Sequence, residues 1–251
     1  MKFCKYQKAI LFLTVASAAC FALPATANAM HIMEGYLPIV HCIAWIVISL
    51  PFLYTGVVRL RQVVKEKRRT LMLLAMSGAF IFVISSLKIP SVTGSSSHMT
   101  GTGLSAILFG VSITSILTVI VLLFQAILLA HGGITTLGAN VFAMGIAGPL
   151  VTMLLYKAGK KMKVNRMVNI FIAAAIGSLC TYIVTALQLA FAYPGEVGGV
   201  MSSAVKFLGV FAPTQIPLAV VEALLTLLVI MGLESLASRE LSDISYGGEL
   251  G

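Results

Sequence analysis

Long apolar runs separated by short polar segments fill most of the chain. Six of these runs are long enough, or nearly long enough, to cross a membrane as a helix, which takes about 20 residues. They cover residues 37–58, 71–87, 104–130, 140–156, 167–193 and 213–236. The pattern predicts an all-α integral membrane protein.

The charged residues support this prediction and indicate its orientation. Only 10% of residues are charged, whereas a soluble domain carries about 25%. The formal net charge of +9 is concentrated in residues 2–8, 59–69 and 157–166, each beside an apolar run. Basic residues in these positions are typical of cytoplasmic loops, so the charge does not indicate a nucleic-acid partner.

The first 29 residues have the features of a secretory signal peptide. Lys2, Lys5 and Lys8 precede a short apolar run over 9–23, and Ala27 and Ala29 form an A-x-A cleavage site. The alternative is a retained first helix, but 15 residues are too few to span the bilayer. We therefore expect residues 30–251 to form a single transmembrane metal-binding domain.

Cleavage after Ala29 gives the mature chain a free amine on Met30, directly before His31. This amine, the deprotonated amide nitrogen of His31 and its imidazole Nδ1 can grip one metal ion through two fused chelate rings. The three nitrogens lie nearly in a plane, which on intrinsic affinity favours Ni(II) or Cu(II). From these residues alone, an exposed polar tail is an equally good interpretation.

Topology places a second histidine on the same side of the membrane. If Met30 is outside, the loop over 88–103 is also outside, and it carries His98 as a candidate fourth ligand. The hydroxyls of Ser97 and Thr100 are candidates for orienting its ring. The basic segment 157–166 is cytoplasmic only if 104–130 contains two segments, with a bend near Gly110, Ser112 or Ser115. The expected total is seven spans and a cytoplasmic C-terminus.

Three other polar residues lie in or beside the apolar runs. His41 fits interfacial packing. His131 ends a helix before two glycines, which favours a helix-terminus role over one in the metal site or in coupling. Glu222 lies deep in the last span, where carboxylates are usually functional; pairing with Lys206 or with a partner subunit is an equal alternative. Without a phosphate-binding loop or a catalytic triad, nothing predicts an enzyme or an ATPase.

The mature N-terminus MHIMEGYLP, the loop segment SSHMTG and the segment HGGITTLGAN together resemble one known family. It is the substrate-binding S component of cobalt and nickel energy-coupling factor (ECF) transporters, and Met33-Glu34 is more similar to the cobalt branch, CbiM. The resemblance runs from Met30 to about Glu234. It implies that Met30, His31 and His98 bind the metal, without an organic cofactor.

The resemblance also implies partners and a location. These are a transmembrane T component, a pair of cytoplasmic ABC-type ATPases and a small accessory membrane protein, in the cell membrane. The substrate would be Co(II), for uptake that supplies cobalamin biosynthesis. Planar nitrogen ligation still favours nickel, so a nickel-specific S component remains an alternative, as does a metal carrier that works without partners.

Overall fold

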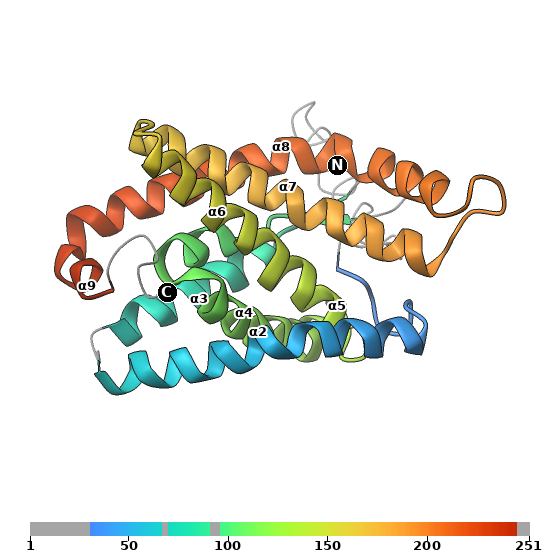
Figure 1. Cartoon of the computed structure of the whole chain (residues 1–251), viewed down its shortest axis with the longest axis horizontal. Coiled ribbons are helices and arrows are strands. Elements are labelled where there is room, and N and C mark those ends of the chain that lie inside the picture. The colour runs from blue at the N-terminus through green and yellow to red at the C-terminus, as the bar shows by residue number, and fades with distance from the viewer. Residues whose placement is uncertain (1–30, 67–69, 91–95, 245–251) are drawn as a thin grey trace, which may run out of the picture.

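The computed structural model describes residues 31–66, 70–90 and 96–244 (Figure 1). Most of this part of the chain is helical, because a chain in hydrocarbon must satisfy its backbone hydrogen bonds internally. The helical elements are α2 (Ile39–Glu66), α3 (Thr70–Ser86), α4 (Thr102–Leu129), α5 (Leu137–Asn140), the π-helix η2 (Val141–Ala147), α6 (Gly148–Lys161), α7 (Arg166–Ala192), α8 (Gly199–Leu236) and α9 (Ser238–Asp243). The predicted signal peptide and Met30 lie outside the described residues.

Five helical stretches in the described part are long and apolar enough to cross a membrane: α2, α4, the continuous run Leu137–Lys161, α7 and α8. The shorter apolar helix α3 joins them. Counting α4 as two arms gives seven membrane segments. The predicted all-α membrane fold is thus confirmed.

Helix α4 is broken at Gly110, whose φ of 77° and ψ of 176° are not helical. A positive φ of this kind favours glycine, which has no Cβ to clash. The hydroxyls of Ser105 and Thr114 lie 2.9 Å apart, although nine residues of straight helix would separate their backbones by about 13 Å. The chain therefore turns back at Gly110, and the predicted bend within 104–130 falls there.

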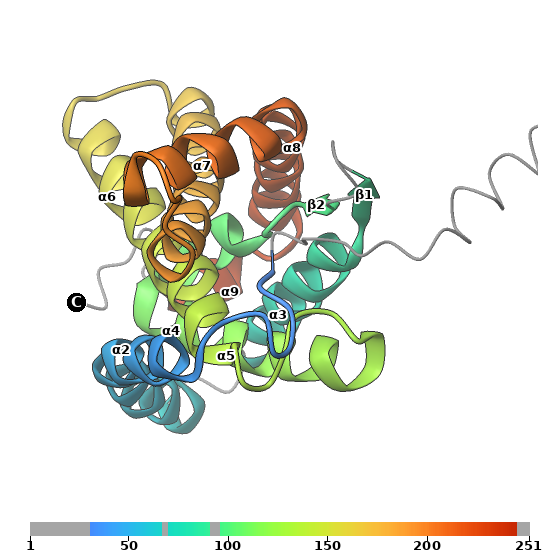
Figure 2. The ribbon, with the colours of Figure 1, turned by 90° about the vertical axis from the view of Figure 1, so that its right-hand side faces the viewer.

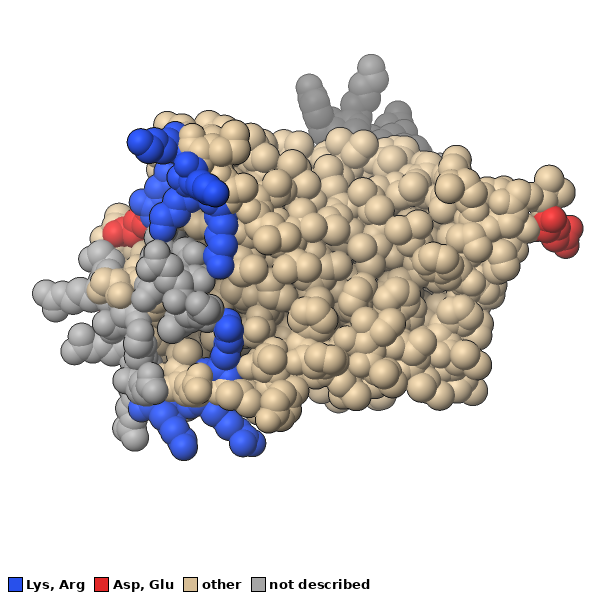
Figure 3. All heavy atoms as spheres, in the orientation of Figure 1, with Lys and Arg blue, Asp and Glu red and all other residues tan. Residues whose placement is uncertain are grey.

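Charge divides the surface into zones along the long axis. Lys and Arg side chains gather at one end of the molecule, and a wide uncharged belt covers the middle (Figure 3). Helix α2 illustrates this belt, because Ile39 and Val40 are each 76% exposed. Such exposure is unfavourable in water but suits a helix surrounded by lipid. The molecule thus has the surface of a multi-pass membrane protein.

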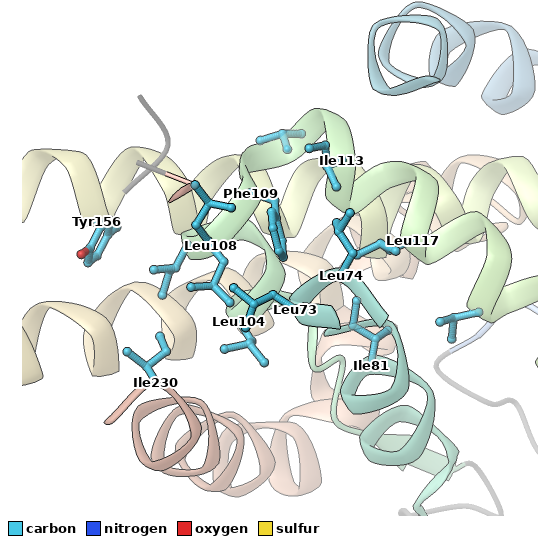
Figure 4. Packing of buried hydrophobic residues seen from close by; sticks show 14 of the residues in the cluster. Leu73, Leu74, Ile81, Leu104, Leu108, Phe109, Ile113, Leu117, Tyr156 and Ile230 are labelled. Carbon is cyan, nitrogen blue, oxygen red and sulfur yellow. The ribbon is translucent and has the colours of Figure 1, made fainter. Parts of the chain in front are cut away.

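A cluster of buried apolar side chains lies where α3 meets both arms of α4 (Figure 4). Leu73 and Ile81 of α3 contribute to it, together with Leu104 and Ile113 from the two sides of the break. Each of the four is at most 2% exposed. This packing holds the short arm 102–109 inside the bundle and therefore fixes the segment just before it, which carries His98.

Two short antiparallel strands, β1 (Lys88–Pro90) and β2 (Ser96–His98), connect α3 to this segment. His98 is the last residue of β2 and pairs with Lys88. Figure 2 shows this hairpin beside α3, with the start of the described chain close to β2. The first described residues and the end of β2 thus meet inside the molecule.

Candidate metal centre

Three histidines converge in the interior from three separate segments: His31 from the N-terminal tail, His98 from the end of β2, and His131 from the loop after α4. One ring nitrogen of each lies within 4.8 Å of the others. The ring centroid of His31 lies 4.1 Å from that of His98 and 4.5 Å from that of His131. All three side chains are at most 3% exposed.

The ring nitrogens of this cluster are largely unpaired, which is rare for buried polar atoms. Nδ1 of His98 donates to the Met99 carbonyl at 2.8 Å, which leaves Nε2 with a free lone pair and no partner. Nδ1 of His31 and both nitrogens of His131 also lack partners. Buried imidazole nitrogens that face one another without hydrogen bonds are suited to hold a transition-metal ion.

The electrostatics keep these imidazoles in the form that a metal requires. Burial lowers the pKa of His98 to about 4 and that of His131 to about 2. Burial also lowers the pKa of His31, and the nearby His98 adds to the effect. All three rings are therefore neutral at neutral pH, so their lone pairs are available to a cation without prior loss of a proton.

The π-helix η2 brings a sulfur atom to the site. It places Met144 so that its Sδ lies 3.2 Å from Nε2 of His31. A thioether can only accept a hydrogen bond, so this contact favours a proton on Nε2 and leaves Nδ1 as the ligand atom. π-Helical turns occur frequently at functional sites. Met144 is not among the residues that the sequence singled out.

The tail that carries His31 is fixed by the side chain of Asn140. The Ile32 N–H donates to Asn140 Oδ1 at 2.9 Å, and Asn140 Nδ2 donates to the Ile32 carbonyl at 3.0 Å. The Thr136 hydroxyl donates to the same carbonyl at 2.7 Å. One buried amide therefore pairs with both backbone groups of the residue next to His31 and sets where its ring lies.

We expect Asn140→Ala to weaken Co(II) binding roughly tenfold, as is typical when a group that orients a metal ligand is lost. The matched control is Asn165→Ala, because Asn165 caps α7 by accepting from the Met167 N–H, in the basic segment that follows α6. Asn165→Ala should lower the stability of the protein by about 1 kcal/mol and leave Co(II) binding unchanged. Isothermal titration of both variants checks this; equal affinities would show that Asn140 does not position the tail.

Two glycines after His131 allow the tail to pack closely. A Cβ on Gly133 would lie 2.6 Å from the backbone nitrogen of Glu34, so only glycine fits there. The Glu34 carboxylate then accepts from the Thr135 N–H at 3.1 Å, and Thr135 hydrogen bonds hold the pKa of Glu34 below its usual value. The segment HGGITTLGAN thus forms the surface on which the N-terminal tail packs.

The segment that carries His98 is fixed by Glu222 of α8. The Glu222 carboxylate accepts from the backbone N–H groups of Thr100 and Gly101, both at 2.8 Å. It also accepts from the hydroxyls of Thr100 and Ser178, the latter at 2.7 Å. These four hydrogen bonds occupy the acceptor sites of the carboxylate and tie the His98 segment to α7 and α8.

We expect Glu222→Ala to destabilise the protein by about 2–4 kcal/mol, because it leaves several buried donors without an acceptor. Co(II) affinity should fall roughly tenfold as the His98 segment loosens. Glu196→Ala is the matched control, since Glu196 is exposed between α7 and α8. Thermal unfolding and titration measure the two effects. A Glu222→Ala protein as stable as the control would contradict this role.

The structure places the remaining predicted residues as follows. The Ser97 hydroxyl pairs with Thr214 at 2.7 Å and that of Thr100 with Glu222. We expected these two hydroxyls to orient the His98 ring, but the Met99 carbonyl orients it instead. The alternative pairing of Glu222 with Lys206 is not what the structure shows. His41 is half-buried on α2 and outside the histidine cluster.

For His131 the helix-terminus interpretation describes only the backbone. Ala130 has a left-handed φ of 46° and caps α4, and the His131 N–H bonds the Gln125 carbonyl at 3.1 Å. This cap turns the His131 side chain into the cluster, so the favoured interpretation missed its position. The signal available in the sequence was that His131 begins the segment HGGITTLGAN, one of the three that carry the family resemblance.

Comparisons with known proteins show the family to which the chain belongs. The family described as "CbiM: Cobalt uptake substrate-specific transmembrane region" matches residues 31–240. A "Cobalt transport protein CbiM" of Lachnoclostridium phytofermentans is 58% identical over 240 residues, covering 96% of each chain. A protein of the same name from Clostridioides difficile is 58% identical over 206 residues, covering 82% of each chain.

Among solved structures, one described as "Crystal Structure of an Truncated Transition metal Transporter" has a TM-score of 0.70 and 26% identity. It covers 82% of this chain and 98% of that one. Family, relatives and fold agree along nearly the whole described part of the chain. The protein is therefore a multi-pass membrane protein of the CbiM family of cobalt transport proteins.

Proposed function

We propose that this chain is the substrate-binding subunit of an ATP-driven ECF-type importer, and that it captures Co(II) at its processed N-terminus. One observation carries the proposal. Three buried, neutral imidazoles converge with unpaired nitrogens, and one of them belongs to His31, the second residue of the predicted mature chain. The names of the relatives, cobalt transport proteins, support the choice of metal.

In this proposal the Met30 amine, the His31 amide nitrogen and Nδ1 of His31 supply three donors, and Nε2 of His98 supplies the fourth. The unpaired Nδ1 of His31 and Nε2 of His98 are the atoms that this scheme requires. His131 then stands as a fifth donor. Ni(II) and Cu(II) prefer four nitrogens in a plane, so a fifth donor makes the site less suited to them and favours Co(II).

The distribution of charge supports an orientation. The basic end of the molecule faces the cytoplasm in this proposal, as the positive-inside rule requires, and the C-terminal helix α9 lies at that end (Figures 1 and 3). The tail and the His98 segment then lie toward the outer side of the membrane, from which the metal is captured.

The sequence contains no phosphate-binding loop, so in this proposal cytoplasmic ATPases supply the energy. The other partners are a transmembrane T component and a small accessory membrane protein. Release of the metal requires the His98 segment to move or the chelate to be reprotonated. Since Glu222 ties that segment to α8, a partner that displaces α8 would act on His98 directly. The geometry therefore gives the partners a route to the metal.

We expect cells that express this chain alone to accumulate little or no cobalt, and cells that also express the T component and ATPases to accumulate it. Uptake of radioactive cobalt measures this, with a phosphate-binding-loop variant of the ATPases as the control. Strong uptake by the isolated chain that an uncoupler abolishes would favour a partner-independent carrier. Strong uptake of nickel but not cobalt would favour a nickel-specific S component.

A further inference from the structure

A second polar site lies at the break in α4, in the half of the molecule that carries the basic residues. A pocket of about 390 Å³ opens there between α2, α4 and α6. Its lining includes the cations Arg59 and Lys157, the hydroxyl of Ser112 and apolar side chains such as Phe52 and Phe109. None of these residues belongs to the histidine cluster.

The two cations of this pocket have no anionic partner within the described part of the chain. An ion pair in the described part of the chain joins Arg166 to Glu234, and neither residue lines the pocket. The pocket lining contains no Asp or Glu. Arg59 is half-buried and Lys157 is exposed. Two cations on separate helices, with no carboxylate in the pocket lining, form a site of positive potential.

The break in α4 creates this pocket. Because the chain turns at Gly110, a new helical arm begins at Val111, and its first turn has N–H groups without partners inside the arm. Gly56 of α2 packs so closely on this arm that a Cβ there would lie 2.2 Å from the Ser112 carbonyl. The contact closes one side of the pocket and brings Arg59, one turn further along α2, beside the break.

We propose that this pocket binds the phosphate of an anionic membrane lipid headgroup, such as that of phosphatidylglycerol. The phosphate would lie between Arg59 and Lys157, and the acyl chains would lie along the apolar wall. Basic pockets between membrane helices on the cytoplasmic side are known sites for such headgroups. An acidic segment of a partner protein has the same charge, but the apolar side chains that line the pocket beside its two cations favour a lipid.

The test uses the full chain, purified in detergent and offered equal amounts of phosphatidylglycerol and phosphatidylcholine with identical acyl chains. Native mass spectrometry counts the lipid retained. We expect a preference for phosphatidylglycerol of roughly thirtyfold, because two basic contacts provide about 1 kcal/mol each. The double variant with Arg59→Gln and Lys157→Gln should lower the ratio of retained phosphatidylglycerol to retained phosphatidylcholine to about one. Arg61→Gln with Lys161→Gln is the matched control, since it removes the same charge from exposed positions outside the pocket.

The single variant Lys157→Gln, at an exposed position, should give an intermediate preference even if the double variant fails to fold. A control pair that loses the preference as fully as the pocket pair would overturn the proposal. Complete displacement of the lipid by millimolar inorganic phosphate would also overturn it, in favour of a site for free phosphate. So would a pocket variant that keeps the lipid preference but no longer associates with its protein partners.

Discussion

A chain with one extra residue before Met30 is expected to lose cobalt uptake. The added residue removes the amine from Met30 and moves His31 to the third position, so the chelate rings no longer form with the same nitrogens. A four-ligand metal site is worth roughly 10–16 kcal/mol, or about 3 kcal/mol per ligand. Loss of two ligands should therefore lower the affinity for Co(II) at least a thousandfold.

Uptake is the better readout for this extension, because a histidine in the third position can build a different chelate that still binds metal. Retention of residues 1–29 should have the same effect as the added residue. A useful control is a chain extended at its C-terminus, which leaves the amine intact. Mass spectrometry should find Met30 as the first residue of the active protein. Normal uptake by the N-terminally extended chain would exclude the Met30 amine as a ligand.

His98→Ala is expected to weaken Co(II) binding on the order of a hundredfold. It removes one donor, worth about 3 kcal/mol, and leaves the N-terminal chelate in place, so some binding should persist. His41→Ala is the matched control, since His41 lies on α2 outside the cluster. Isothermal titration with Co(II) and Ni(II) measures both variants. Equal losses for the two would mean that His98 has no special role.

The membrane segments were predictable from sequence because each depends on a local property. A span requires a run of apolar residues, and five of the six runs match helices closely, although α2 continues past the predicted end of its run to Glu66. The sixth run was predicted too short, because α8 begins at Gly199 and continues through Pro213, where the run was expected to start. The bend near Gly110 followed from the need to keep both basic loops on one side. The positions of His31 and His98 on the same side followed from the same count of crossings.

The supports of the site were not predictable, because they join residues far apart in the sequence. Asn140 pairs with Ile32 across 108 positions, and Glu222 meets Thr100 across 122. No local spacing encodes these contacts. His131 was assigned to a helix end because its neighbours are glycines. Only the fold shows that the left-handed conformation of Ala130 directs the His131 ring toward His31.

The central claim is that Co(II) is held by nitrogens of the tail and the histidine cluster. X-ray absorption at the cobalt edge, on the processed chain loaded with one equivalent of Co(II), tests it most directly. We predict a first shell of nitrogen neighbours, with the outer-shell scattering that imidazole rings produce, and its reduction in His98→Ala. A shell of oxygens without imidazole scattering, unchanged in that variant, would contradict the claim.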